Sequence, residues 1–245
     1  MPFAPPSSPS RHSPALAPCW HGHCRCAAYS PRPRMTKILL TRHGHVEGIH
    51  PERFRGREPL ALTARGRAEA AAVARRIADG TWRPSKIYTS PMGRCVETGA
   101  AIAEACGIAA EVCGDLTDID YGTWTFKAFE EANKDDPVLF AAWFATPQLV
   151  RFPNGESLQD LAARAANALR FVLARHPNDT IVLVGHDSVN RALLLQFLDL
   201  PLSAYRRLAQ DPCCLNEIDI DREKVCILRV NETYHLDAKA AGGHA

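Results

Sequence analysis

The sequence lacks the features that mark membrane-spanning, secreted and nucleic-acid-binding proteins. Within its 245 residues no apolar run approaches the roughly 18 residues of a transmembrane helix. The amino terminus has no continuous apolar stretch of the kind found in secretory signals. The formal net charge is only +2, so no global field favours nucleic acid or a membrane surface as a partner. We therefore expect a cytoplasmic protein with neither of these partners.

Familiar nucleophile and metal motifs are also missing. No glycine-rich phosphate loop precedes a Lys-Ser or Lys-Thr pair, and the run Gly185-His-Asp-Ser-Val189 lacks the final glycine of a serine-hydrolase elbow. The nine cysteines are odd in number, and several lie in apolar segments, which is typical of buried thiols in a reducing compartment. The cysteines and histidines between positions 19 and 26 do not have the paired spacing of zinc ligands. We predict no metal and no cofactor.

The first 34 residues differ in composition from the rest of the chain. They are rich in Pro, Ser and Arg, contain no acidic residue and show no helical or strand period, so we expect a disordered extension. Met35 opens an apolar strand-like run, which suggests that the upstream segment is a start-site artefact; an organelle transit peptide is the alternative. The predicted domain organisation is this extension, one domain over 35–238, and a flexible tail over 239–245.

From Lys37 onward, short apolar runs alternate with alanine-rich helical patterns. Strands are expected at about 37–42, 86–89, 110–113, 180–185, 213–219 and 224–230. Helices are expected from Thr63 to Gly80, from a Ser90 cap with Pro91 at the first helical position to Gly107, over 156–175, and over 187–198. Apolar strands separated by helices predict an α/β fold, a three-layer sandwich with a mainly parallel central sheet and helices on both faces.

Four cationic or imidazole side chains follow the expected strands. Arg42 and His43 end the first strand, Arg94 lies near the start of a helix, and His186 ends the strand at 180–185. In such folds ligands bind beyond the carboxyl ends of the strands. Guanidinium groups match phosphate oxygens, and helix N-termini add backbone N–H donors. The sequence therefore predicts a phosphate site with a histidine nucleophile in it.

These residues belong to a set of motifs that resembles the histidine phosphatase superfamily, in its phosphoglycerate-mutase-like branch. The resemblance covers about residues 36 to 230. The motifs occur in the family's order: Arg42-His43-Gly44, Ser90-Pro-Met-Gly-Arg94, Gly122-x-Trp124, Gly155-Glu-Ser157 and Val184-Gly-His186.

The resemblance implies a fold, a set of roles and an assembly state. It implies a phosphoglycerate-mutase-like fold in which His43 is the nucleophile that becomes phosphohistidine. It implies that Arg42, Arg94 and His186 bind the phosphate and that Asp118 is the proton donor. Members of the family are often dimeric, so a homodimer is a further expectation.

The mechanism places two requirements on the side chains. His43 must be neutral with one ring nitrogen free, so we predict that its other nitrogen donates to a backbone carbonyl. Asp118 must be protonated when the leaving alkoxide departs, and a dianionic substrate beside it would raise its pKa.

The chain departs from the family pattern around the nucleophile. Most members have glutamate where this chain has Asp118, and the mutases have polar substrate contacts where this chain has Ile49 and Arg55. We predict that Arg55 and Tyr121 contact the substrate, and that Arg53 and Arg57 are also available to an anion. The segment before the Gly-Glu-Ser motif is short and aromatic-rich, which predicts a compact cap.

These departures favour hydrolysis over mutase activity. The leading hypothesis is a metal-independent phosphatase that hydrolyses small phosphorylated metabolites. The alternative enzyme is a phosphoglycerate mutase. The alternative from another class is a catalytically silent phosphate-binding scaffold, which would bind phosphate without turnover.

Overall fold

A computed structural model describes residues 35–221 and 224–237, so the extension and the tail expected at the two ends lie outside the described residues. Six strands form one sheet in the order β3-β2-β4-β1-β5-β6. The strands are β1 (Thr36–Arg42), β2 (Pro84–Thr89), β3 (Ala110–Val112), β4 (Thr180–Gly185), β5 (Leu215–Ile220) and β6 (Val225–Glu232). The predicted α/β class with a mainly parallel central sheet is confirmed.

Parallel pairing joins the four strands β3, β2, β4 and β1, while β5 and β6 pair in antiparallel fashion at one edge. The central pair sets the geometry of the site, because β1 and β4 run in register and Arg42 lies opposite Gly185 at their carboxyl ends. Both strands are buried along most of their length, as expected of parallel strands covered on both faces.

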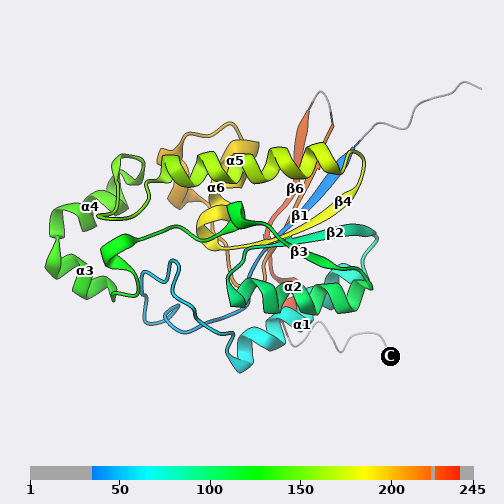
Figure 1. Ribbon diagram of the computed structural model, residues 1–245, viewed down its shortest axis with the longest axis horizontal. Helices are drawn as coiled ribbons and strands as arrows, with labels where there is room; N and C mark the ends of the chain where they lie inside the picture. The colour runs from blue at the N-terminus through cyan, green and yellow to red at the C-terminus, as the bar shows by residue number, and fades with distance from the viewer. Residues whose placement is uncertain (1–34, 222–223, 238–245) are drawn as a thin grey trace, which may run out of the picture. The chain divides into compact units, whose positions relative to one another are not determined.

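Helices cover the two faces of this sheet (Figure 1). Helices α1 (Ala64–Ala78) and α2 (Gly93–Cys106) lie on one face, and α5 (Leu158–Arg175) and α6 (Asp187–Phe197) lie on the other. The alternation of side chains along β1 divides the core accordingly. Leu39 packs with residues of α1 and α2, whereas Ile38 and Leu40 pack with residues of α5 and α6.

One predicted helix start is confirmed, one is wrong, and a third helix has a serine cap that was not predicted. The Thr63 hydroxyl accepts from the Gly66 N–H at the start of α1, and the Ser157 hydroxyl accepts from the Asp160 N–H at the start of α5. The prediction that Ser90 caps a helix with Pro91 as its first residue is wrong, because α2 begins at Gly93. Ser90 instead lies fully buried at the end of β2, where its hydroxyl faces the ring of His186.

A small aromatic layer forms the expected cap. Helices α3 (Phe129–Asp135) and α4 (Pro137–Ala145) follow the Gly-x-Trp turn and lie together at one end of the α5 side (Figure 1). Buried Phe54, from the loop after the nucleophile, touches five aromatic rings of this region at centroid distances between 4.6 and 6.4 Å: Tyr121, Trp124, Phe129, Phe140 and Phe152. The loop that was expected to carry substrate contacts is therefore anchored to the cap by aromatic packing.

The turn after β1 approaches the start of α1 very closely, and two glycines allow it. A Cβ atom added to Gly44 would lie 2.3 Å from the Gly66 carbonyl oxygen, and one added to Gly66 would lie 2.1 Å from the His45 carbonyl oxygen. These distances are far below van der Waals contact, and the atoms that would be struck are backbone atoms. The close approach fixes the loop that carries His43 against a rigid helix.

We predict that Gly66→Ala destabilises the protein by about 1–3 kcal/mol, since the added methyl has to displace backbone. The matched change Gly114→Ala should have little effect, because nothing lies within 4 Å of a Cβ at that position. Chemical denaturation of both variants measures the free energy of unfolding. Equal stabilities would show that the turn can relax away from α1.

Candidate active site

The ends of β1 and β4 bring the two histidines together. The backbone N–H of His43 donates to the Gly185 carbonyl at 3.1 Å, and this hydrogen bond extends the β1–β4 ladder by one residue past Arg42. The imidazole rings of His43 and His186 then meet edge to face with centroids 5.2 Å apart. Both rings are almost completely buried, with exposed fractions of 2% and 0%. The pairing of the two strands therefore builds the centre of the predicted site.

His43 has the protonation state that a nucleophile requires. Its Nδ1 lies 2.7 Å from the Gly44 carbonyl oxygen. A carbonyl can only accept, so Nδ1 carries the proton and Nε2 has a free lone pair. Burial, with the positive charges of Arg94 and Arg42 and the neighbouring His186, holds the pKa of His43 well below its ordinary value of 6.5. The predicted hydrogen bond to a backbone carbonyl is confirmed.

Arg42 presents unused donors to the same space. Its Nη1 donates to the Gln210 carbonyl at 2.6 Å, but its buried Nε and Nη2 have no hydrogen-bond partner among the described residues. Behind it, the side chains of Gln210 and Asn216 form a buried amide network that also bonds Leu40 of β1. The network fixes one edge of the guanidinium and leaves the other edge open to an anion.

Arg94, the second residue of α2, is the largest fully buried side chain. Its Nη1 donates to the Glu58 carbonyl at 2.8 Å and its Nη2 to the Gly56 carbonyl at 2.6 Å, and Nη2 also lies 3.0 Å from Asp118 Oδ2. Its Nε has no hydrogen-bond partner among the described residues. A buried cation with an unused donor is costly unless an anion completes its contacts. Two such cations face this site.

Asp118 is the buried acid that partly neutralises these cations. Besides Arg94, its carboxylate accepts a 2.5 Å hydrogen bond from Ser188 Oγ and lies 3.4 Å from His186 Nδ1. Burial by itself raises the pKa of Asp118, but the His186 ring, the Arg94 guanidinium and the Ser188 hydrogen bond together bring it below 3.8. In this state of the protein Asp118 is therefore ionised, whereas a proton donor has to be protonated.

His186 contacts polar groups on both edges of its ring. Its Nε2 lies 2.8 Å from the Ser90 hydroxyl oxygen, and its Nδ1 faces Asp118. Burial lowers the pKa of His186 to about 3, with Arg94 and Arg42 acting in the same direction and Asp118 opposing them. At neutral pH it is thus an uncharged ring that can donate one hydrogen bond and accept another.

The three arginines of the loop after the nucleophile differ in their surroundings. Arg57 pairs with Asp120 and Glu156, and Arg53 stacks on the Phe126 ring and lies 3.9 Å from Glu131. The prediction that all three are available to an anion therefore fits only Arg55.

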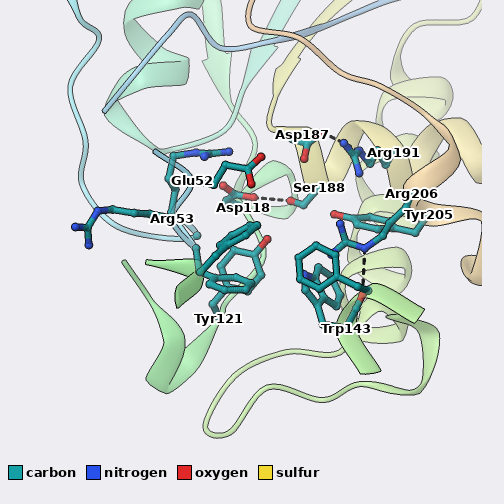
Figure 2. Close-up of a pocket in the computed structure, with 15 residues that line it drawn as sticks. Glu52, Arg53, Asp118, Tyr121, Trp143, Asp187, Ser188, Arg191, Tyr205 and Arg206 are labelled. Atoms are coloured by element: carbon teal, nitrogen blue, oxygen red, sulfur yellow. Dashed lines mark hydrogen bonds and ion pairs between the residues drawn. The ribbon is translucent and has the colours of Figure 1, made fainter. Parts of the chain in front are cut away.

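A cavity of about 180 Å³ opens beside Asp118, and it contains the two predicted substrate contacts. Arg55 and Tyr121 both line it, together with residues of the cap and of α6. Figure 2 shows Tyr121 on one wall, Trp143, Tyr205 and Arg206 on the facing wall, and Asp118 and Ser188 between them. Sequence reasoning did not identify Ser188, Tyr205 or Arg206, although the place of Ser188 in the first turn of a helix that starts at the sheet edge was a usable signal.

Two other features are absent from the part of the chain that the structure describes. Within residues 35–221 and 224–237, no group of three or more His, Cys, Asp and Glu side chains has an arrangement that could hold a metal ion. None of the helices in this part of the chain combines the length and the apolar composition needed to cross a bilayer.

The chain resembles known proteins over most of its length. A family model described as "Histidine phosphatase superfamily (branch 1)" matches residues 38–233. "Phosphoserine phosphatase 1" of Hydrogenobacter thermophilus is 31% identical over 202 residues, which covers 82% of this chain and 95% of that protein. A "Probable phosphoglycerate mutase" of Klebsiella pneumoniae is 29% identical over 217 residues, covering 84% and 97%. Among solved structures, YhfR of Bacillus stearothermophilus aligns with a TM-score of 0.77 at 27% identity, covering 82% and 100%.

The buried neutral histidines predict a specific dependence of stability on pH. His186 stays uncharged in the folded protein down to about pH 3, whereas the unfolded chain binds a proton near pH 6.5. The unfolded state therefore gains protons first, and stability is lost as the pH falls from 6.5 toward 3. We predict that His186→Asn flattens this slope by up to about 1.4 kcal/mol per pH unit.

Urea denaturation of both proteins at half-unit steps between pH 4 and pH 8 measures these slopes. A variant with the same slope as the unmodified protein would show that His186 is charged in the folded state.

Proposed function

The chain belongs to the histidine phosphatase superfamily, and we propose that it hydrolyses small phosphorylated metabolites through a phosphohistidine formed at His43. One observation carries the proposal. The buried guanidinium groups of Arg42 and Arg94 leave three N–H donors unused beside a neutral imidazole whose Nε2 is free. A phosphate monoester supplies what this arrangement lacks, since its oxygens accept from the donors and its phosphorus accepts the lone pair.

The first chemical step transfers the phosphoryl group to the histidine. His43 Nε2 attacks phosphorus in line with the leaving oxygen, the N–P bond forms and the P–O bond to the alcohol breaks. Asp118 gives its proton to the departing alkoxide, and the alcohol leaves. The Nδ1–H bond to Gly44 spreads the positive charge that develops on the ring.

The second step regenerates the protein. Water attacks the phosphorus of the phosphohistidine, the Asp118 carboxylate takes one of the water protons, and the N–P bond breaks. Inorganic phosphate leaves, His43 is neutral again, and Asp118 holds the proton for the next cycle. Arg42, Arg94 and His186 bind the equatorial oxygens in both steps. We call these three side chains the phosphate cradle, and it keeps the phosphoryl group in one place while its bond partner changes.

Asp118 must gain its proton when substrate binds. In the described structure the His186 ring, Arg94 and the Ser188 hydrogen bond lower the pKa of Asp118 and keep it ionised. Arriving phosphate oxygens compete for the Arg94 guanidinium and place negative charge beside the carboxylate, and both changes raise the pKa of Asp118. Binding of the substrate thus protonates Asp118 and prepares it to act as the acid.

Mutase activity is a second candidate, because one relative carries the name "Probable phosphoglycerate mutase". A mutase returns the phosphoryl group from His43 to a second hydroxyl of the bound substrate, so no net phosphate is released. Following both phosphoglycerate isomers and free phosphate in the same assay separates the two activities.

We predict that the purified protein releases phosphate from small phosphate monoesters in excess chelator, and that His43→Ala lowers kcat about a thousandfold or more. Brief incubation with a radiolabelled phosphate ester should yield an acid-labile phosphoprotein that this variant does not form. His50→Ala, a change at an exposed histidine of the same loop, serves as the matched control. Phosphate binding without turnover in the unmodified protein would instead support a silent scaffold.

Replacing Asp118 distinguishes two roles: donating a proton to the leaving group and holding Arg94 in place. We predict that Asp118→Asn lowers kcat by about 10²–10⁴ for alkyl phosphates, whose alkoxide needs a proton, and much less for p-nitrophenyl phosphate, whose leaving group does not. Asp118→Glu keeps a carboxyl group and should retain most of the activity. Equal losses on both ester types in Asp118→Asn would show that Asp118 only holds Arg94 in place.

A further inference from the structure

The cavity beside Asp118 contains more positive charge than one phosphoryl group uses. Four arginines line it: Arg53, Arg55, Arg191 and Arg206. Two of these have acidic neighbours, since Arg191 Nε lies 2.8 Å from Asp187 Oδ1 and Arg53 lies near Glu131. Arg55 and Arg206 form no ion pair with any described residue.

Arg55 is held in place by a neutral group. Its Nη1 donates to the Gly48 carbonyl at 2.7 Å, which fixes the guanidinium without neutralising it. Burial and the charge of Arg42 lower the pKa of Arg55, with Tyr121, Asp118 and Asp187 opposing them. Arg55 lines the same cavity as Asp118, the acid that pairs with Arg94.

Arg206 is also held rigidly by neutral groups. Its guanidinium carbon lies 4.0 Å from the centroid of the Phe144 ring and 5.0 Å from that of Trp143, and its Nε donates to the Trp143 carbonyl at 3.1 Å. These contacts occupy the face and one N–H of the guanidinium, so its two terminal nitrogens remain for a ligand. Figure 2 shows Arg206 across the cavity from Tyr121, on the same wall as Tyr205.

The acids around the cavity do not neutralise these two cations. Asp118 pairs with Arg94 and Asp187 pairs with Arg191. Glu52, the remaining acid of the lining, is exposed, and solvent screens its charge. A positioned guanidinium that has no counter-ion and faces a cavity is suited to bind an anion without reorganisation.

We infer that the substrate carries a second anionic group, a carboxylate or a further phosphate, which Arg206 binds together with Arg55 while the transferred phosphoryl group lies on His43. The inference rests on the proposed function for the position of the first phosphate. It makes Arg206 a specificity-determining residue, since the cap that carries its stacking partners also sets the distance between the two anionic groups.

Matched pairs of phosphate esters test this inference. O-phosphoserine and phosphoethanolamine differ only in a carboxylate, and 3-phosphoglycerate and glycerol 3-phosphate differ in a carboxylate against a hydroxymethyl group. Fructose 1,6-bisphosphate and fructose 6-phosphate differ in one phosphate group, so this pair tests a phosphate as the second anionic group. Calorimetry on the full-length His43→Ala variant measures dissociation constants without turnover, and kcat/KM on the unmodified protein measures selectivity.

For at least one pair, the ester with the second anionic group should bind about tenfold or more tightly, as charge-assisted hydrogen bonds are expected to provide. Adding Arg206→Met, which keeps a long apolar side chain on the two rings, should reduce that ratio to near one, and Arg206→Lys should restore part of it. Arg76→Met is the matched control, since Arg76 also stacks on a tryptophan, Trp82, but lies outside this cavity.

The possible failures are distinguishable. If no pair shows tighter binding of the ester with two anionic groups, or if Arg206→Met and Arg76→Met have the same effect on the ratio, the inference is overturned while phosphatase activity stands. If the ratio depends on Arg206 but the unmodified protein releases no phosphate from any ester, the second anion site stands and hydrolysis fails.

Discussion

The structure around the site depends on the burial of two guanidinium groups with only one carboxylate, that of Asp118, nearby. Arg42 and Arg94 are 6% and 0% exposed, and among the described residues Asp118 forms an ion pair with Arg94 but none with Arg42. Burying a charge without a counter-ion is strongly unfavourable, and the fold lessens that cost with main-chain carbonyls of Gln210, Glu58 and Gly56. Carbonyl oxygens hold the guanidinium groups but leave their charge in place. The site is therefore built to be completed by an anion.

The same requirement explains several features of the fold. The carbonyls that hold Arg94 come from the loop after the nucleophile, and that loop is fixed at Phe54 by the aromatic layer and at Gly44 by the close approach to α1. Loss of either anchor would release the carbonyls and leave Arg94 buried with fewer partners. Packing far from the phosphate cradle thus contributes to its electrostatics.

The sequence was sufficient to predict the parts of the site that depend on regular structure. Residues that end a parallel strand must meet at one sheet edge, so Arg42, His43 and His186 could be placed together before the structure was known. Arg206 and Gln210 could not, because Arg206 lies in a short 3₁₀ helix (Leu202–Arg207) and Gln210 in the loop after it, and tertiary packing sets the path of both. The start of α2 was misplaced for a related reason. The capping signal at Ser90-Pro91 is local, whereas the burial of Ser90 against His186 is a tertiary contact.

The aspartate at position 118 changes how the acid can be controlled. Ser188 and Arg94 each hold one oxygen of its carboxylate, so both oxygens are occupied in the ionised state. A proton can be added to either oxygen once the partner on that oxygen stops donating to it. The Ser188 hydroxyl can rotate and accept instead of donating, but a guanidinium can only donate. Protonation at the oxygen that faces Arg94 therefore requires that Arg94 turn to another anion. Proton supply at this oxygen is thus linked to phosphate binding, whereas protonation at the other oxygen requires only that the Ser188 hydroxyl rotate.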